Sequence, residues 1–345
     1  MELMDLSTLI SWRATCRALY TEVCGFLRRA LHRIISPFFS HPLVFLEHLS
    51  QSRAVIGGIV ALSFVLRDPY LRSDVLQLYA GCGWYNTFVD KLVNCGSNAR
   101  DIDRYHTPSV LPSFTTERDI HSQTVLQLKN GRRIVIYRAK TASACSPVCR
   151  SPFSVFNNFV TEHSFGCGYP RLTLQRRSIL SDLRLGYMDS DDEYLFDLLC
   201  RSGFTFAVSP TAWSEFRRSV LLPVRANSHL CARQWNVCPM QGRYFGDKGS
   251  FVDFLDPLSP TLPVVRSMGI PPFGPMVAWR LHTSLECAEL CDVRDPVLHE
   301  WLVSTPLLIL PNPYSEAAQN PHRTERGRVM SDNPSNTAGK RSRSL

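Results

Sequence analysis

The chain has 345 residues, of which 44% are apolar and 20% charged, proportions that are typical of folded globular proteins and exclude wholesale disorder. Its 12 cysteines are too dilute for a disulfide scaffold, and we expect them to be reduced. The net charge of +8 permits an acidic partner. The basic residues are scattered, however, and most of the excess lies at the two ends, which argues against a nucleic-acid partner.

Membrane insertion and secretion are not expected. No apolar stretch approaches the roughly 18 residues that span a bilayer. Residues 1–31 alternate charged and apolar positions and lack the clean apolar run of a secretory signal. We therefore expect an intracellular protein, cytoplasmic or nuclear, with no membrane partner.

Residues 1–35 are expected to form two helices. Apolar positions recur at intervals of three and four, first from Leu6 to Val23 and then from Cys24 to Ile35, which is the spacing of amphipathic helices. Asp5 or Ser7 can cap the first helix. A packed connector follows, and a short helix is predicted over Pro42–Gln51.

Residues 5–20, DLSTLISWRATCRALY, resemble the latter half of an F-box. That helical motif reads Asp-Leu, several apolar residues, and a Cys-Arg or Ser-Lys pair before a large apolar residue. The matching residues here are Asp5, Leu6, Leu9, Ile10, Thr15, Cys16, Arg17, Leu19 and Tyr20. The motif's Leu-Pro opening is missing, so the match is to a truncated F-box. The resemblance implies that a Skp-type adaptor of a ubiquitin ligase binds Leu6, Leu9, Ile10, Cys16 and Leu19. The alternative is a plain helical hairpin that caps the next domain.

The segment from residue 53 to residue 79 is expected to form an α/β unit. A short β-branched strand ends on Gly57 and Gly58, a helix covers Ile59–Leu66, and a strand follows over Asp74–Tyr79. Glycines at the end of a strand let the backbone approach a ligand closely. This unit is therefore the place where the chain could house chemistry.

A β-hairpin is the strongest local signal further along the chain. Two β-rich runs, Gln123–Lys129 and Arg132–Arg138, flank Asn130-Gly131, a dipeptide suited to the positive φ angles of a tight turn. A helix is predicted before it over Trp84–Val93, and residues 94–117 are expected to be loop because they contain two prolines.

Two helices are predicted after the hairpin. Ser151–Glu162 has an apolar face and a proline in its first turn. Ser190–Cys200 opens with a capping box, since Glu193 follows Ser190 at the required spacing.

The remaining segments give weaker signals. They are a strand and a short helix in residues 169–183, a short helix at 213–221, a turn-rich stretch at 232–257, strand and helix content in 279–310, and a basic tail from residue 312 that is expected to be disordered.

The central unit and the hairpin together resemble the minimal core of the nucleotidyltransferase superfamily. That core carries Gly-Gly or Gly-Ser after its first strand, an Asp-x-Asp or Asp-x-Glu pair on the next strand, and a third carboxylate on a later one. Paired carboxylates can hold metal ions against a triphosphate because alternate residues of a strand point the same way. The resemblance implies a mixed sheet with inserted helices and a nucleotide pocket formed here by Gly57, Gly58, Ser73 and Asp74.

This chain departs from that pattern at its acidic positions. Asp74 is present, but Leu76 stands where the second acid should be, and residues 133–138 contain no acid. One carboxylate cannot organise two divalent cations. The sequence therefore predicts a degenerate pocket with no catalytic residue, no metal and no cofactor.

The order of several short motifs resembles a group of fungal proteins that pair an F-box-like start with a degenerate nucleotidyltransferase-like domain. The matching residues are Gly58, Ala61, Leu62, Phe64, Ser73, Asp74, Leu78, Tyr79, Ser151, Pro152, Tyr169, Pro170, Cys238, Pro239, Arg243, Phe245 and Asp247. The match covers roughly residues 1–257.

A zinc site is a further alternative. Cys145, Cys149, His163 and Cys167 have spacings that fall within zinc-site ranges. Against it, two prolines crowd the first pair of cysteines, and a core of this size does not need a metal.

The sequence thus predicts an α/β (α+β) fold in three parts: an F-box-like helical segment at 1–35, a nucleotidyltransferase-like domain at 36–311, and a disordered tail at 312–345. The leading hypothesis is a non-catalytic interaction protein, an F-box-type receptor that presents an unknown substrate protein to a ubiquitin ligase. The alternatives are a divergent metal-dependent nucleotidyltransferase that uses Asp74, and a zinc-stabilised nucleic-acid-binding protein.

Overall fold

In the computed structural model, which describes residues 4–94, 102–110, 119–182, 190–216, 232–255, 276–282 and 307–310, the N-terminal apolar stripes form helices. These helices are α1 (Leu6–Arg13), α2 (Arg17–Ile35) and α3 (Pro42–Gln51). Asp5 caps α1, since its Oδ1 accepts a hydrogen bond from the Thr8 backbone N–H at 2.7 Å. The division between α1 and α2 lies at residues 14–16, earlier than the predicted division at Cys24.

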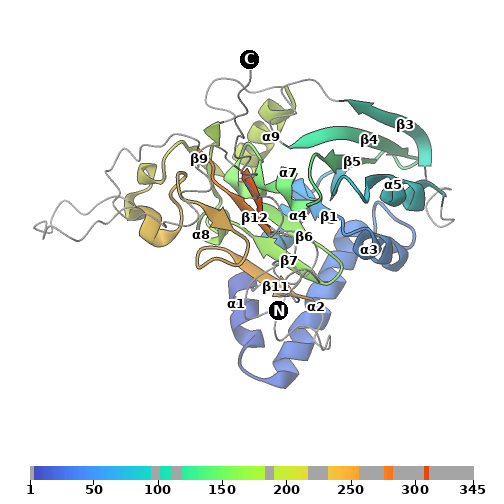
Figure 1. The fold of residues 1–345 in the computed structure, drawn as a ribbon. Coiled ribbons are helices and arrows are strands. Elements are labelled where there is room, and N and C mark those ends of the chain that lie inside the picture. The colour runs from blue at the N-terminus through green and yellow to red at the C-terminus, as the bar shows by residue number, and fades with distance from the viewer. Residues whose placement is uncertain are drawn as a thin grey trace, which may run out of the picture. The chain divides into compact units, whose positions relative to one another are not determined.

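An eight-stranded mixed sheet forms the centre of the chain (Figure 1). Its strand order is β11-β7-β6-β1-β2-β5-β4-β3. Only β2 and β5 are parallel neighbours, and the other neighbouring pairs are antiparallel. The strands are β1 (Val55–Gly57), β2 (Val75–Ala80), β3 (Ile102–Val110), β4 (Ile120–Leu128), β5 (Arg133–Ala139), β6 (Asn158–Val160), β7 (Ser164–Cys167) and β11 (Phe251–Phe254). The predicted class, a mixed α/β fold around a mixed sheet, is confirmed at this level.

Smaller elements surround this sheet. The helices are α4 (Gly58–Leu66), α5 (Tyr85–Asn94), α7 (Cys145–Cys149), α8 (Pro170–Thr173) and α9 (Ser190–Arg201). Strands β8 (Arg177–Ile179) and β9 (Thr205–Ala207) form a parallel pair. A third sheet joins β10 (Arg243–Tyr244), β12 (Met276–Trp279) and β13 (Leu307–Leu310).

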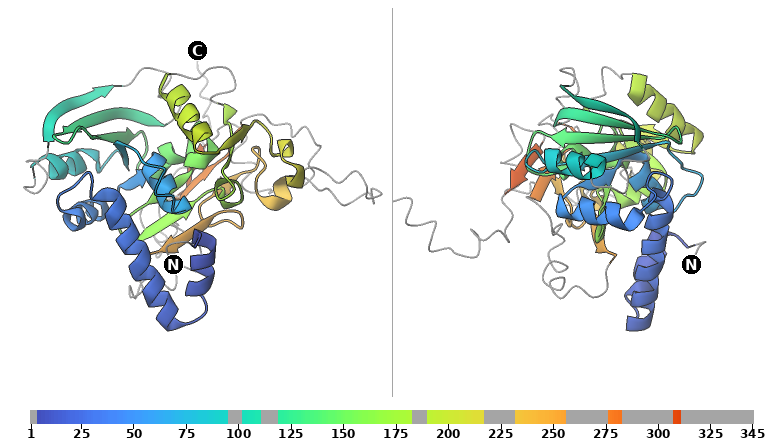
Figure 2. Two further views of the ribbon diagram at one scale, coloured as in Figure 1. Left: turned by 180° about the vertical axis from the view of Figure 1, so that it is seen from behind. Right: turned by 90° about the vertical axis from the view of Figure 1, so that its right-hand side faces the viewer.

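One face of the central sheet is buried against helices. In β2 the exposure alternates, with Leu76, Leu78 and Ala80 buried and the residues between them half-buried. These apolar side chains share one core cluster with residues of α1, α2, α3, α4 and α5. Figures 1 and 2 show α3 and α5 on the same side of strands β3, β4 and β5. The N-terminal helices therefore pack into the same core as the sheet, within one compact unit, Met1–Leu310.

The hairpin is confirmed, although its turn differs from the predicted one. Gly131 has φ of 84°, but Asn130 is not among the residues with positive φ. The Gly131 N–H donates to the Leu128 carbonyl at 3.0 Å, and the Leu128 N–H donates to the Arg132 carbonyl at 2.8 Å. The loop therefore has three residues, a turn followed by a left-handed glycine, which needs only one residue with positive φ.

The expected loop at residues 94–117 contains strand β3, so that prediction was wrong where the chain is described. β3 is an edge strand of the sheet, and its register with β4 shifts between His106 and Ser109. Pro108 lies within that shift. Proline has no N–H to give to a ladder, and edge strands and bulges tolerate it.

The predicted helix over Ser151–Glu162 was also wrong. The segment forms a short 3-10 turn at Ser154–Phe156 and then strand β6. Every residue from 151 to 160 is buried, so the segment lacks the solvent-exposed face that an amphipathic helix has. Polar side chains bond to backbone instead, as when Ser154 Oγ accepts from the Ile179 N–H at 2.8 Å.

The C-terminal predictions are only partly covered. The helix at Ser190–Arg201 is confirmed, but the Ser190 side chain of its capping box lies outside the described residues. The segment at 213–221 forms a 3-10 turn, Ser214–Phe216, as far as it is described. The tail at 312–345 and most of the stretch at 279–310 lie outside the described residues.

Candidate functional site

Gly57 and Gly58 lie where β1 meets α4, as the sequence predicts, but side chains of β2 fill the space above them. Gly58 has φ of 61°, and a Cβ there would lie 1.8 Å from Gln77 Oε1. A Cβ on Gly57 would lie 2.6 Å from the Tyr79 ring. Both glycines are therefore explained by close packing of β1 and α4 against β2.

Ser73 and Asp74 form the turn that starts β2. Ser73 Oγ accepts from the Val75 N–H at 3.0 Å and donates to the Val75 carbonyl at 2.8 Å. The Asp74 side chain is 84% exposed, and its Oδ1 lies 3.4 Å from Arg132 Nε. The Asp74 carbonyl accepts from the Arg133 N–H at 2.9 Å. These contacts organise the start of the parallel pair formed by β2 and β5.

The position of the second expected acid is part of the core. Leu76 is fully buried and clusters with Ile134 and Ile136, which face the helices from β5. A carboxylate at residue 76 would be surrounded by apolar side chains rather than by a ligand. Among the described residues, no group of three His, Cys, Asp or Glu side chains is placed to hold a metal ion.

The four residues of the zinc alternative do not converge. Cys145 and Cys149 lie on α7 in one core cluster, whereas Cys167 belongs to another. His163 is one third exposed, and its Nε2 lies 3.1 Å from Glu162. Burial raises the pKa of the Cys145 and Cys167 thiols to about 12 and that of Cys149 well above its ordinary value. All three cysteines are therefore described as buried core side chains.

The α1–α2 hairpin divides the residues of the F-box-like match into buried and accessible ones. Leu6 and Leu9 are completely buried in the core. Ile10 and Leu19 are half-buried, and Cys16 is exposed. Any partner in this conformation would meet the latter three.

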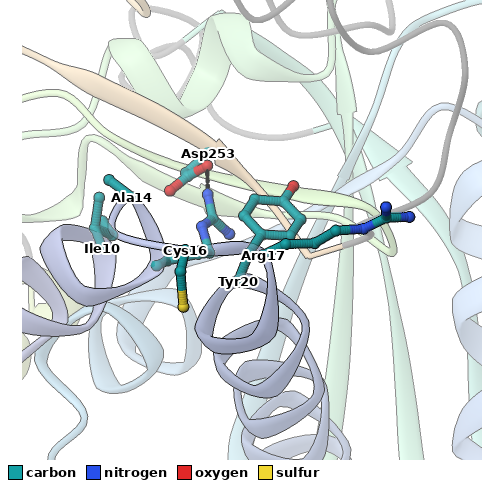
Figure 3. A pocket seen from close by; sticks show the side chains of 7 residues that line it. Ile10, Ala14, Cys16, Arg17, Tyr20 and Asp253 are labelled. Atoms are coloured by element: carbon teal, nitrogen blue, oxygen red, sulfur yellow. Dashed lines mark ion pairs between the residues drawn. The ribbon is translucent and has the colours of Figure 1, made fainter.

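A groove of about 530 Å³ opens at the turn between α1 and α2. It is lined by Ile10, Arg13, Ala14, Cys16, Arg17, Tyr20 and Asp253. Figure 3 shows Ile10 and Ala14 on one side of the groove, Tyr20 on the other, and Asp253 of β11 behind them. Four of the residues that carry the F-box-like match therefore share one surface depression.

Arg13 fastens the hairpin to the sheet. It is 6% exposed and forms an ion pair with Asp253 on the edge strand β11. Its guanidinium also donates to the Phe254 carbonyl at 2.5 Å and lies 5.0 Å from the Tyr20 ring centroid. Burial lowers the pKa of Arg13. The guanidinium thus covers an edge carbonyl that would otherwise be available to another strand.

Two of the short motifs meet at a buried cation. Arg243 is fully buried, and its Nε and Nη2 lie 2.5 Å and 2.9 Å from the Asp247 carboxylate. It also donates to the Gly168 carbonyl at 2.9 Å and stacks over Tyr169, 4.7 Å from the ring centroid. The sequence showed these residues only as separate matches, and no signal in it indicated that they touch. Their contacts with one another give both motifs a structural role.

Comparisons with protein-family models, with curated proteins and with solved structures found no match to this chain. Within the described ranges, no helix has both the length and the apolar character that a membrane crossing needs.

Proposed function

We propose that this chain is a non-catalytic interaction protein whose α1–α2 hairpin binds a Skp-type adaptor, while the body built on the mixed sheet presents an unknown protein to a ubiquitin ligase. The observation that supports it best is the groove at the hairpin turn. Ile10, Cys16, Arg17 and Tyr20 belong both to the F-box-like match and to the lining of this groove. Trp12, on the last turn of α1, is 43% exposed and adds a large apolar contact.

The rigid attachment of the hairpin supports the same proposal. The ion pair between Arg13 and Asp253 and the buried side chains Leu6 and Leu9 fix α1 relative to the sheet. A partner that binds a pre-organised surface pays less conformational entropy than one that must order a loose segment. A hairpin held in this way would also keep a bound substrate at a defined distance from the ligase.

The surroundings of Asp74 support the non-catalytic part of the proposal. Its carboxylate is exposed beside Arg132, the next alternate position on the strand is buried, and Gln77 fills the space above Gly58. No observation favours the nucleotidyltransferase alternative or the zinc alternative over this proposal. Magnesium-dependent nucleotide binding that is lost in Asp74→Asn would contradict it.

The direct test is binding of a purified Skp-type adaptor to the full chain by isothermal titration calorimetry. Trp12→Ala removes an exposed aromatic side chain, and Cys16→Glu places a bulky charge in the groove. We expect each change to weaken binding by at least about tenfold, the effect of losing a contact worth roughly 1.4 kcal/mol. Tyr194→Ala is the matched control, because Tyr194 is a 63% exposed aromatic residue on α9.

Two results would contradict the proposal. One is an adaptor that does not bind the unmodified chain at concentrations of about 100 μM. The other is an adaptor whose affinity is the same for Trp12→Ala, Cys16→Glu and the Tyr194→Ala control.

A further inference from the structure

The face of the sheet opposite the helices carries a regular array of side chains on β2, β5 and β4. The pairing registers place them in three rows: Val75, Arg133 and Gln127; Gln77, Val135 and Val125; Tyr79, Tyr137 and Gln123. Alternate residues of a strand share a face, so these nine side chains lie on one surface. We call it the β2–β5–β4 grid.

The grid is accessible, whereas the residues between its members are buried. Arg133 is exposed, and the other eight side chains are half-buried. On the reverse face Leu78, Ile136 and Leu126 are completely buried against the helices. Most of the apolar requirement of the sheet is met by that reverse face. On the grid side, Tyr79 also packs against a second core cluster that includes Val55 and Val148.

The grid combines polar, aromatic and β-branched side chains. It contains three glutamines, two tyrosines and an arginine, and no aspartate or glutamate. Tyr79 and Tyr137 are cross-strand partners with stacked rings, 5.0 Å between centroids and 22° between planes. Arg104 on β3 pairs with Gln127 and is 78% exposed, so a second guanidinium extends the first row; its Nε lies 3.8 Å from the carboxylate of Asp103.

We propose that the β2–β5–β4 grid binds single-stranded nucleic acid. Bases stack on aromatic rings that are presented by a sheet, and the stack of Tyr79 and Tyr137 offers such a platform. Glutamine amides both donate and accept hydrogen bonds, which suits the edges of unpaired bases. Arg133 and Arg104 lie at the edge of the grid opposite the tyrosines and provide cations for the phosphates.

An extended peptide is the other macromolecule that a sheet face can bind. The grid fits a peptide less well, because its aliphatic side chains are three valines, which are small anchors. The sequence argued against nucleic acid because its basic residues are scattered along the chain. The strand register brings together Arg133 and Arg104, which no sequence pattern relates. This proposal does not depend on the adaptor-binding proposal.

The test uses the full chain and a fluorescein-labelled single-stranded RNA of about 12 mixed-sequence nucleotides, with binding followed by fluorescence anisotropy. Tyr137→Ala should weaken binding by roughly 5- to 100-fold, and Tyr137→Phe, which keeps the ring, should bind like the unmodified chain. Arg133→Gln should reduce the slope of log K against log salt by about 0.7. The matched controls are Tyr70→Ala and Arg171→Gln, both at exposed positions outside the grid, and neither should change binding.

Thermal melting shows whether each variant is folded. If Tyr137→Ala does not fold, Tyr137→Phe and Arg133→Gln still test the proposal. Three results would overturn the proposal. One is no binding of the RNA at about 50 mM salt, and another is equal binding of the RNA by Tyr137→Ala and by the controls. The third is that polyglutamate displaces the RNA equally well from Tyr137→Ala and from the unmodified chain. Loss of binding on neutralising Lys340, Arg341 and Arg343, with no effect of the grid variants, would assign the RNA to the basic tail and overturn it as well.

Discussion

Replacing Arg243 with methionine should destabilise the chain more than any surface change. The side chain is fully buried and holds the carboxylate of Asp247, which is itself 12% exposed. It also donates to the carbonyls of Gly168 and Asn236 and stacks on Tyr169. Methionine fills most of the volume but satisfies none of these acceptors. Removing one member of a buried ion pair costs about 3–5 kcal/mol, because the other charge remains buried and unpaired.

The lower end of that range applies here. After the change Asp247 still accepts hydrogen bonds from three backbone N–H groups, those of Tyr244, Gly249 and Ser250. We therefore expect a loss of about 3 kcal/mol in the free energy of unfolding. For a unit of this size that loss lowers the melting temperature by about 5 °C.

Urea denaturation followed by circular dichroism measures this loss, and a double-mutant cycle with Asp247→Asn separates the pair from the carbonyl contacts. Arg243→Lys should recover only part of the stability, because an ammonium cannot match the fork of a guanidinium. Arg171→Met, at an exposed position, is the control and should change stability by less than about 0.5 kcal/mol. A loss below about 1 kcal/mol in Arg243→Met, or no coupling with Asp247, would refute the argument.

Three further predictions follow from single contacts. Gly58→Ala should cost about 2 kcal/mol or more in the free energy of unfolding, because the residue has φ of 61° and its Cβ would overlap Gln77. Adding Gln77→Ala should restore only part of this loss, and a full restoration would show that the positive φ contributes nothing. Burial lowers the pKa of His48 from 6.5, so the unfolded state takes up its proton first and the free energy of unfolding should fall as the pH drops through 6.5. Urea titrations at about pH 8 and pH 5 should show a smaller fall in His48→Gln than in the unmodified chain, and an equal fall would contradict this prediction. Iodoacetamide should label the exposed Cys16 rapidly, whereas it should label the buried Cys145, whose thiol pKa is about 12, only on unfolding. Labelling of both cysteines in the folded chain, detected by mass spectrometry, would contradict the burial of Cys145.

Local patterns predicted the elements that depend on local sequence. Helix α3 has the predicted bounds, Pro42–Gln51, because an apolar stripe and an N-terminal proline coincide there. Strands β4 and β5 follow from two β-rich runs on either side of Gly131. The predictions were wrong where long-range packing determines the secondary structure. Residues 151–160 are all buried, and β3 forms by pairing with β4.

The candidate sites show the same division. The sequence could place Gly57 at the end of a strand, where it lies, and Asp74 at the start of the next, where it lies one residue before Val75, the first residue of β2. It could not show that Tyr79 covers Gly57, since that contact depends on the antiparallel pairing of β1 with β2. The contact of Tyr169 with Arg243 was equally invisible, because it joins residues that are far apart along the chain.

The parity of β2 connects these observations. Its even-numbered residues, among them Leu76, face the helices, and its odd-numbered residues, among them Gln77 and Tyr79, face the opposite side. The second acid of a pair that begins at Asp74 would stand at residue 76 and would therefore point into the core, where an unpaired carboxylate is costly. Any ligand that reaches this part of the sheet must meet the odd-numbered face instead. That face carries three amides, two rings, three valines and one guanidinium but no acid among its nine described positions, so its chemistry suits the stacking bases of the proposed nucleic acid better than a metal-bound triphosphate.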